Sequence, residues 1–333
     1  MYAQRAMLLI CHKAPPSSIF PLLVVSHSLC SKQVKASTLL EFSLFGLTTV
    51  LFRRKKPILG TIIVTDRCNL RCKHCSVNNL TAIIHPYAQV KAEMEKLYAM
   101  GVRILFFCGG ETFLWKDSGR TIRDLVREAK EMGFRIVNIV TNGTQGLDLP
   151  EADLILLSLD GDKEHHNIIR GNTYDLIMRN IEQATSDNIC LYMAVNQINK
   201  GCIRSVCDVA RQQPKVRAVS FNFHTPYPDT RDLVLTREDK VACCAEIEQL
   251  MDEGYPIFNL RSAFPYIIDN NFPTPCYQCV VMENGELSTC GRCIHVPGLC
   301  DECGYFFAAE YALVFRGNLR VITEMLRTYT RYV

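Results

Sequence analysis

Short apolar runs alternate with amphipathic segments between residues 58 and 225, and this alternation constrains the fold more than any other feature of the chain. Each run is apolar along its length, as in a strand that is covered on both faces, and the intervening segments have helical spacing. Strands that alternate with helices in this way predict a parallel sheet. The six expected strands are 58–65, 102–107, 135–140, 154–159, 189–195 and 216–223.

This repeated unit is too short for a closed eight-stranded barrel. We therefore predict an α/β fold with a partial (β/α)6 TIM-like barrel of parallel strands, and an open doubly wound sheet is the alternative. The expected domains are an apolar N-terminal segment (1–57), a core (58–235) and a cysteine-rich C-terminal region with closing helices (236–333). The expected helices are 87–100, 121–132, 174–184, 203–212, 237–253 and 305–330, whereas 272–303 is expected to be loop-like.

Three cysteines follow the first expected strand with the spacing C-x3-C-x2-C: Cys68, Cys72 and Cys75. The carboxyl ends of parallel strands usually carry the chemistry of an α/β fold. Three thiolates on one short loop can hold three irons of a cubane and leave the fourth iron open, as a catalytic site requires. A zinc site completed by His74 or a distant ligand is the alternative, although zinc cysteines usually come as two separated pairs.

This motif resembles the signature of the radical S-adenosylmethionine (SAM) superfamily. The resemblance implies a 4Fe–4S cluster whose open iron binds the amino and carboxylate groups of SAM. It also implies that one electron, from a donor such as flavodoxin or ferredoxin, cleaves SAM to methionine and a 5′-deoxyadenosyl radical. That radical would then remove hydrogen from a substrate, while the protein positions and shields the reactants.

Further motifs resemble the same family at successive strand ends. Gly109, Gly110 and Glu111 follow the second strand like the family's GGE motif, in which backbone carbonyls and the Glu111 carboxylate would accept hydrogen bonds from the SAM ammonium. Thr112 stands where the family usually has proline. The resemblance further assigns SAM contacts to Asn142, Ser158, Asp160 and Arg170. Taken singly, each of these residues also suits an ordinary turn or helix start, and no catalytic residue is assigned.

A second cysteine cluster forms three CxxC pairs near the C-terminus: Cys276/Cys279, Cys290/Cys293 and Cys300/Cys303. Paired CxxC motifs within 30 residues indicate a metal site, and a metal would supply much of the folding energy of so loop-rich a segment. The segment resembles the SPASM or twitch extension of the radical SAM family, which implies one auxiliary 4Fe–4S cluster. Cys276, Cys290, Cys300 and Cys303 fit the resemblance best. A structural zinc ribbon is the alternative.

The composition limits the remaining possibilities. The formal net charge of +3 and the absence of a basic stripe with interleaved aromatics argue against nucleic acid as a partner. Seventeen cysteines, an odd number, at short spacings favour metal ligands in a reducing, cytoplasmic setting over disulfides.

Residues 42–52 are uncharged and precede four basic residues, 53–56. A helix on a membrane surface, within residues 38–56, and a helix that plugs one end of the core are equally consistent with this pattern.

Two functions follow from these observations. The first is a radical SAM oxidoreductase or synthase that acts on a peptide or small molecule, with a membrane lipid as an alternative substrate. The second is a zinc-stabilised structural or regulatory interaction protein. The three-cysteine loop and the loop at Gly109–Glu111 argue against the second function, because a scaffold needs neither.

Overall fold

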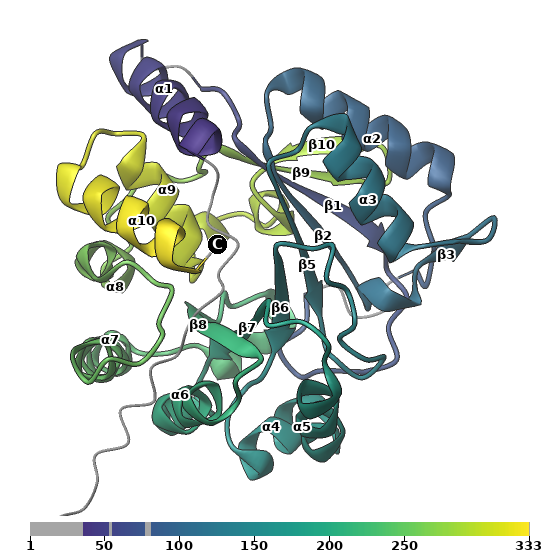
Figure 1. Ribbon diagram of the computed structural model, residues 1–333. Helices are drawn as coiled ribbons and strands as arrows, with labels where there is room; N and C mark the ends of the chain where they lie inside the picture. The colour runs from purple at the N-terminus through teal and green to yellow at the C-terminus, as the bar shows by residue number, and fades with distance from the viewer. Residues whose placement is uncertain (1–35, 53–54, 77–80, 333) are drawn as a thin grey trace, which may run out of the picture. The chain divides into compact units, whose positions relative to one another are not determined.

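A computed structural model of the chain describes residues 36–52, 55–76 and 81–332, and it describes residues 36–40 by their helical backbone alone. Six parallel strands form the centre of the fold (Figure 1). The predicted partial barrel is confirmed, and each strand lies within two residues of its expected position. The strands are β1 (Leu59–Thr65), β2 (Ile104–Gly109), β5 (Ile136–Thr141), β6 (Leu154–Ser158), β7 (Ile189–Val195) and β8 (Val216–Phe223).

Sequential pairing sets the order of these strands as β1-β2-β5-β6-β7-β8, with every pair parallel. This order places the strand ends at residues 65, 109, 141, 158, 195 and 223 along one edge of the sheet. Because the connections run back along the helices, polar residues that are far apart in sequence meet at that edge.

A hairpin from the cysteine-rich region extends the same sheet. Strand β9 (Cys279–Glu283) pairs in parallel with β1, and β10 (Glu286–Thr289) pairs antiparallel with β9. The prediction of a loop-like 272–303 is therefore wrong for residues 279–289. The two strands are short, so their sequence pattern predicts a strand only weakly. The strongest local indication of a hairpin is the turn Asn284-Gly285 between them.

Helices cover the sheet, and those predicted over 87–100, 121–132, 174–184, 203–212 and 237–253 are confirmed within one residue at each end. The helical prediction for 305–330 is confirmed as two helices, and a short helix at 163–170 lies where the sequence suggested a helix start. The α-helices after α1 are α2 (Tyr87–Met100), α3 (Ile122–Met132), α4 (Lys163–Arg170), α5 (Tyr174–Gln183), α6 (Ile203–Gln212), α7 (Arg237–Asp252), α8 (Phe264–Ile268), α9 (Phe306–Val314) and α10 (Leu319–Tyr332). Short 3-10 helices span 112–114, 200–202, 228–233, 261–263, 292–295 and 299–302, and a small hairpin joins β3 (Lys116–Asp117) to β4 (Arg120–Thr121).

The core lies between the sheet and these helices. Side chains on the helix-facing side of the strands, such as Ile62, Leu105 and Val137, are fully buried together with Leu97 of α2 and Leu125 of α3. Burying an aliphatic side chain of this size contributes about 1.5–3 kcal/mol. Alternate strand residues point to the opposite, inner face of the sheet, where they line cavities described below.

Helix α1 (Ala36–Phe52) packs on the amino-terminal side of the barrel. Phe45 meets Phe315 edge-on with ring centroids 5.6 Å apart, and the Glu41 carboxylate pairs with Arg103 and Arg135. These contacts agree with the interpretation of this segment as a helix that closes one end of the core. Among the described residues, no helix is both long and apolar enough to cross a membrane.

Candidate active site

A cavity of about 200 Å³, which we name the cysteine cavity, lies at the carboxyl ends of the parallel strands. The structure brings together there eight of the residues that the sequence predicted to bind the cluster or SAM. They are Cys68, Cys72, Cys75, Gly109, Gly110, Asn142, Ser158 and Arg170. Glu111, Asp160 and the C-terminal cysteines do not line this cavity.

Glu111 supports the cavity from behind. Its carboxylate is fully buried and accepts hydrogen bonds from the backbone N–H of Phe113 (3.0 Å), the Thr141 hydroxyl (2.7 Å) and the backbone N–H of Asn142 (2.8 Å). Burial raises the pKa of Glu111, and these hydrogen bonds oppose the rise. The structure therefore shows Glu111 holding Asn142 in place, and the contact to SAM that was expected of Glu111 stays a prediction.

The two glycines before Glu111 allow the second strand end to approach the cysteine loop. A Cβ atom at Gly109 would lie 2.4 Å from the Thr65 carbonyl oxygen, and one at Gly110 would lie 2.3 Å from that of Arg67. In addition, the Gly110 N–H donates to the Thr65 oxygen (2.7 Å) and the Glu111 N–H to the Arg67 oxygen (2.9 Å). Any larger residue would force the two loops apart.

Arg170 connects the fourth strand end to the cysteine loop. It forms an ion pair with the fully buried Asp160, which also accepts a hydrogen bond from the Ala194 N–H (2.9 Å). Its guanidinium donates to the Cys72 sulfur (3.8 Å) and to Nε2 of His74 (3.3 Å). Burial raises the pKa of the Cys72 thiol to about 11, and the charge of Arg170 opposes this rise. Thus Asp160 orients a cation toward the cysteines from outside the cavity wall.

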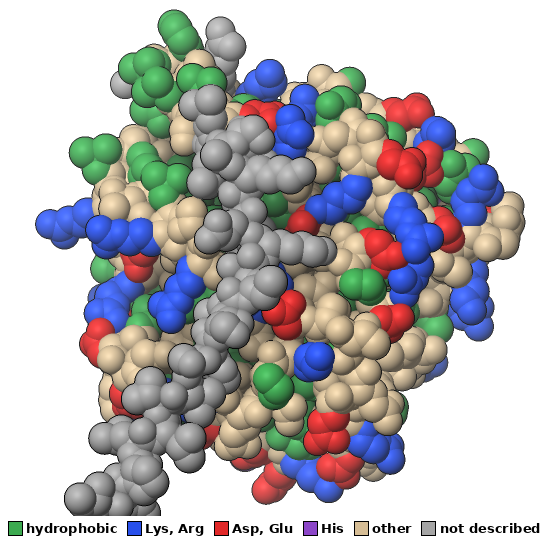
Figure 2. Space-filling view, viewed as in Figure 1, with side chains coloured by type: hydrophobic (Ala, Val, Ile, Leu, Met, Phe, Trp, Pro, Cys, Tyr) green, Lys and Arg blue, Asp and Glu red, His purple; other side chains and the backbone are tan. Residues whose placement is uncertain are grey.

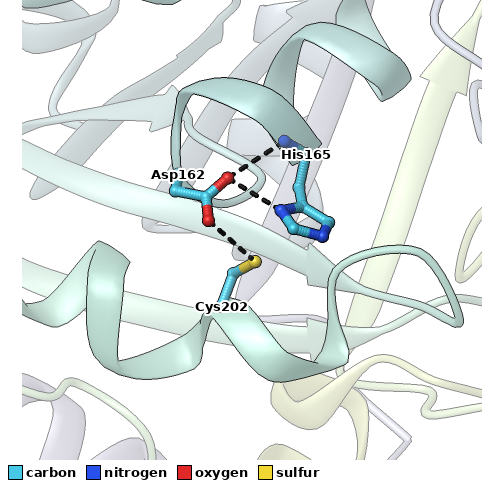
Figure 3. A group of neighbouring side chains, drawn as sticks. All are labelled: Asp162, His165 and Cys202. Atoms are coloured by element: carbon cyan, nitrogen blue, oxygen red, sulfur yellow. Dashed lines mark hydrogen bonds and ion pairs between the residues drawn. The ribbon is translucent and has the colours of Figure 1, made fainter.

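Arg170 is the last residue of helix α4, and Figure 3 shows the side chains at the start of this helix. The Asp162 carboxylate accepts a hydrogen bond from the His165 N–H (3.0 Å) and contacts His165 Nδ1 (2.8 Å), while the Cys202 thiol donates to its other oxygen (3.8 Å). These three side chains offer ligand atoms within 4.8 Å of one another. The bond from the His165 N–H caps the helix, and the other two contacts engage the same carboxylate, so we assign the group a structural role.

His74 is a cavity residue that sequence reasoning left out of the predicted site. It lines the cysteine cavity opposite His224, with ring centroids 6.3 Å apart. Burial lowers the pKa of His74 to about 4, so the ring is neutral near pH 7. Its Nδ1 atom is buried and has no hydrogen-bond partner among the described residues. A buried polar atom without a partner is costly, and this atom belongs to a side chain that lines the cysteine cavity.

The six C-terminal cysteines lie close to one another at the sheet edge beside β1. The Cys290 N–H donates to the Cys279 carbonyl (2.8 Å), and the Cys279 N–H donates to that of Cys276 (3.2 Å). Cys303 interacts electrostatically with Cys276, Cys290 and Cys300. A hydrogen bond from Cys293 lowers the pKa of the Cys290 thiol. The structure thus gathers all three predicted pairs in one place.

Arg292 joins the two cysteine regions. Its guanidinium donates to Asp66 (2.9 Å) and to the Ser76 carbonyl (3.1 Å), which flank the first cysteine loop. It also pairs with Glu283 of β9. Nothing in the local sequence identifies this role, because the three partners come together only when β9 pairs with β1.

The donor sets of both regions fit iron–sulfur clusters. The first offers three sulfur donors on one loop beside a cavity lined by polar residues such as Asn142 and Ser158, as a cubane with one open iron and a bound cosubstrate would need. The second offers six thiols, more than the four that one further cubane takes. Fold and site together define a protein of the iron–sulfur class with a parallel-barrel core.

Comparisons with known proteins give the family. Residues 62–208 match the Radical SAM superfamily. The chain is 27% identical over 278 residues to Fe-coproporphyrin III synthase of Methanosarcina barkeri, which covers 75% of this chain and 63% of that protein. It is 29% identical over 181 residues to the sporulation killing factor maturation protein SkfB of Bacillus subtilis, which covers 50% of this chain and 42% of SkfB.

The fold is similar to that of Streptococcus suis SuiB in its crystal structure with the precursor peptide SuiA. The TM-score is 0.55 at 14% sequence identity, and the match covers 84% of this chain and 71% of SuiB. Residues 62–208 therefore form a radical SAM region, and the similarity to radical SAM proteins supports a 4Fe–4S cluster and SAM as cofactors and a cysteine-rich auxiliary-cluster region at the C-terminus. The chain spans less than two thirds of the length of the synthase and of SkfB.

Proposed function

We propose that this protein is a radical SAM enzyme, an oxidoreductase or synthase, with Cys68, Cys72 and Cys75 as ligands of the SAM-binding cluster. When bound, the reduced cluster would cleave SAM to methionine and a 5′-deoxyadenosyl radical that abstracts hydrogen from a substrate. The observation that carries this proposal is the meeting of the three cysteines with Asn142, Ser158 and Arg170 around one cavity. An electron donor such as flavodoxin or ferredoxin would supply the electron.

The surrounding side chains have separate tasks in this proposal. The Asn142 amide donates to the Cys68 sulfur (3.8 Å) and Arg170 donates to the Cys72 sulfur (3.8 Å), so two of the three thiolates receive hydrogen bonds that favour their charged form. His74 and Ser158 face the space where SAM would bind. Glu111 and Asp160 hold Asn142 and Arg170 in position from buried sites.

An anaerobic preparation of the full chain tests the proposal. We expect about eight irons with matching sulfide per chain, which corresponds to two cubanes, and 5′-deoxyadenosine after addition of SAM and dithionite. Zinc without iron would instead favour the zinc-stabilised scaffold. Iron without any 5′-deoxyadenosine would contradict the catalytic part of the proposal.

We infer that the substrate is a peptide. This inference is supported by the relatives, since SkfB is a maturation protein of the sporulation killing factor and SuiB was crystallised with a precursor peptide. Expression of the chain in its source cells, followed by mass spectrometry of small peptides, tests the inference. We expect a peptide whose mass changes only when Cys72 is intact. A mass change confined to a tetrapyrrole or lipid fraction would contradict it.

We also propose that α1 and α10 contact a membrane surface. Leu44, Leu47, Leu51 and Phe52 of α1 and Leu319 of α10 are between 53% and 77% exposed. Figure 2 shows hydrophobic side chains gathered over these helices, at the upper left. In the sequence, four basic residues at 53–56 directly follow α1, as suits anionic headgroups.

Co-sedimentation with vesicles tests this second proposal. We expect the chain to bind vesicles that contain one third phosphatidylglycerol, and a Leu47→Glu/Leu51→Glu variant to bind at least tenfold more weakly. Equal binding of the variant, or full solubility of the intact chain beside such vesicles, would overturn it. Surface leucine substitutions of this kind should leave 5′-deoxyadenosine formation unchanged.

A further inference from the structure

A second cavity, of about 290 Å³, lies against the inner face of the sheet, and we name it the inner cavity. Alternate residues of the strands form one wall, for example Leu154 and Leu156 of β6 and Cys190 and Tyr192 of β7. The opposite wall comes from the C-terminal region and includes Tyr305, Phe307, Glu310, Tyr311 and Tyr329.

The inner cavity adjoins the cysteine cavity. Six residues line both spaces, so the two share a wall at the carboxyl ends of the strands. These residues are Ser76, Val140, Tyr192, Asn222, Tyr227 and Tyr305. A group held in the inner cavity would therefore lie beside the place where SAM is proposed to bind.

The lining of the inner cavity is mostly apolar and aromatic, and its three asparagines are hydrogen-bonded to the protein backbone. Asn138 accepts a hydrogen bond from the Leu154 N–H (3.1 Å), Asn222 from the Phe306 N–H (2.8 Å), and Asn259 exchanges two hydrogen bonds with the Phe221 backbone (2.7 and 2.9 Å). These three asparagines are therefore held by the protein, and most of the remaining lining offers apolar contact to a ligand.

Apart from the thiols of Cys279 and Cys290 at the edge of the second cysteine region, the described residues that line the cavity carry no unpaired charge. Arg292 is its only lysine or arginine, and that guanidinium is paired with both Asp66 and Glu283. Glu310 is its only carboxylate, and it accepts a hydrogen bond from the Leu260 N–H (2.9 Å). Burial raises the pKa of Glu310 to about 8, so this side chain is mostly neutral near pH 7.

We propose that the inner cavity receives an uncharged apolar side chain, aliphatic or aromatic, of the peptide substrate and presents it to the SAM site. This rests on the proposed function, and it adds which part of the substrate reacts. Moving a charged group into such surroundings without a partner is strongly unfavourable. The volume is at the lower end of ligand pockets and suits one side chain better than a whole tetrapyrrole with its carboxylates.

A binding experiment tests this proposal without relying on catalysis. The iron-loaded protein with SAM, but without reductant, is titrated with N-acetyl-4-fluoro-L-phenylalaninamide and followed by ¹⁹F NMR line broadening. We expect saturable binding, with competition by N-acetyl-L-leucinamide and none by N-acetyl-L-glutamate or N-acetyl-L-lysinamide at equal concentration.

Two variants locate the binding site. Leu156 and Phe106 lie on two different strands, and of the two cavities these residues line only the inner one. Leu156→Lys and Phe106→Lys therefore each introduce a cation into that cavity. We expect each to weaken binding of the fluorinated probe by about tenfold or more, whereas Leu156→Met, which conserves volume and polarity, should bind within about twofold of the wild type. Because the two substitutions lie on different strands, the test can still be made if one of the two variants fails to fold.

The outcomes separate this proposal from the proposed function. Charged probes that bind as tightly as the apolar ones, no binding of any apolar probe, or unchanged binding in both folded lysine variants would each overturn the apolar-side-chain proposal. A protein that binds the apolar probe as expected but forms no 5′-deoxyadenosine on reduction would instead remove the proposed function.

Discussion

The two cysteine regions of this protein are organised in different ways. Cys68, Cys72 and Cys75 lie on one loop and are contacted by side chains from other strand ends, notably Asn142 and Arg170. The C-terminal cysteines lie mainly against one another, next to a short hairpin. The sulfurs of the first region are thus contacted by side chains from several strand ends, whereas the cysteines of the second contact one another within a segment that is joined to the barrel by the pairing of β9 with β1.

This difference assigns different tasks to the two regions. A cluster that must bind a cosubstrate needs donors of several kinds around an open space, and the first region has them in Asn142, Ser158 and Arg170. The C-terminal region contributes a wall instead, because Tyr305, Glu310 and Tyr311 cover the inner face of the sheet. The following predictions test how far the two regions can be separated.

The largest effect is expected at the first region. Cys72→Ala removes one of three cluster donors and should abolish 5′-deoxyadenosine formation, while iron falls by about half because the second region keeps its cluster. Iron analysis together with chromatography of the SAM products measures both. Cys207→Ala, a buried cysteine of α6 away from both cavities, is the matched control and should retain both properties.

A serine scan of the six C-terminal cysteines comes next. Because one cubane takes four thiolates, four variants should lose about half of the iron, and two should keep it. We expect the losses at Cys276, Cys290, Cys300 and Cys303, with SAM cleavage retained in all six. Loss of SAM cleavage in every variant would show that the two regions fold as one unit.

The pH dependence of the free energy of unfolding should reflect the burial of Glu310, which lies in α9 and lines the inner cavity. Burial raises the pKa of Glu310 from about 4.5 to about 8, so the folded state holds a proton that the unfolded state releases. The contribution of Glu310 to the free energy of unfolding should therefore be largest below pH 4.5. It should fall by on the order of a few kcal/mol as the pH rises toward 8. Anaerobic urea unfolding at several pH values should show this slope in the wild type and a flatter one in Glu310→Gln.

A smaller effect is expected where the two regions meet. Arg292→Ala leaves Asp66 and Glu283 without their shared partner in a mostly buried setting and should cost about 2 kcal/mol of unfolding free energy. Arg231→Ala, which removes an exposed pair with Glu302, is the control and should cost less than about 1 kcal/mol. Equal effects of the two substitutions in urea unfolding would contradict a coupling role for Arg292.

The smallest effect is expected at the cap of α4. Asp162→Ala should destabilise the protein by about 1 kcal/mol, because the His165 N–H loses its acceptor. Asp162→Asn keeps a capping oxygen and should be within a few tenths of a kcal/mol of the wild type. A larger loss in Asp162→Asn, relieved by added zinc, would indicate that the Asp162, His165 and Cys202 group binds metal after all.

Much of the core was predictable because its signals are local. The apolar runs that form β1, β2 and β5–β8 are strands within two residues of their expected positions, since a strand covered on both faces must be apolar throughout. The cysteine loop and the residues after each strand were predictable for a related reason. In a parallel barrel the carboxyl ends converge, so residues such as Asn142 and Ser158 reach one cavity.

The sequence alone therefore determined the parallel barrel and the first cysteine site, whose parts each carry a short-range pattern. Only the tertiary structure decided that β9 joins the sheet beside β1, that Arg292 links the two cysteine regions, and that Glu111 and Asp160 lie behind the cavity wall. The reason is physical. Pairing of distant strand edges, and the side from which a buried carboxylate is satisfied, depend on long-range packing that no local spacing encodes.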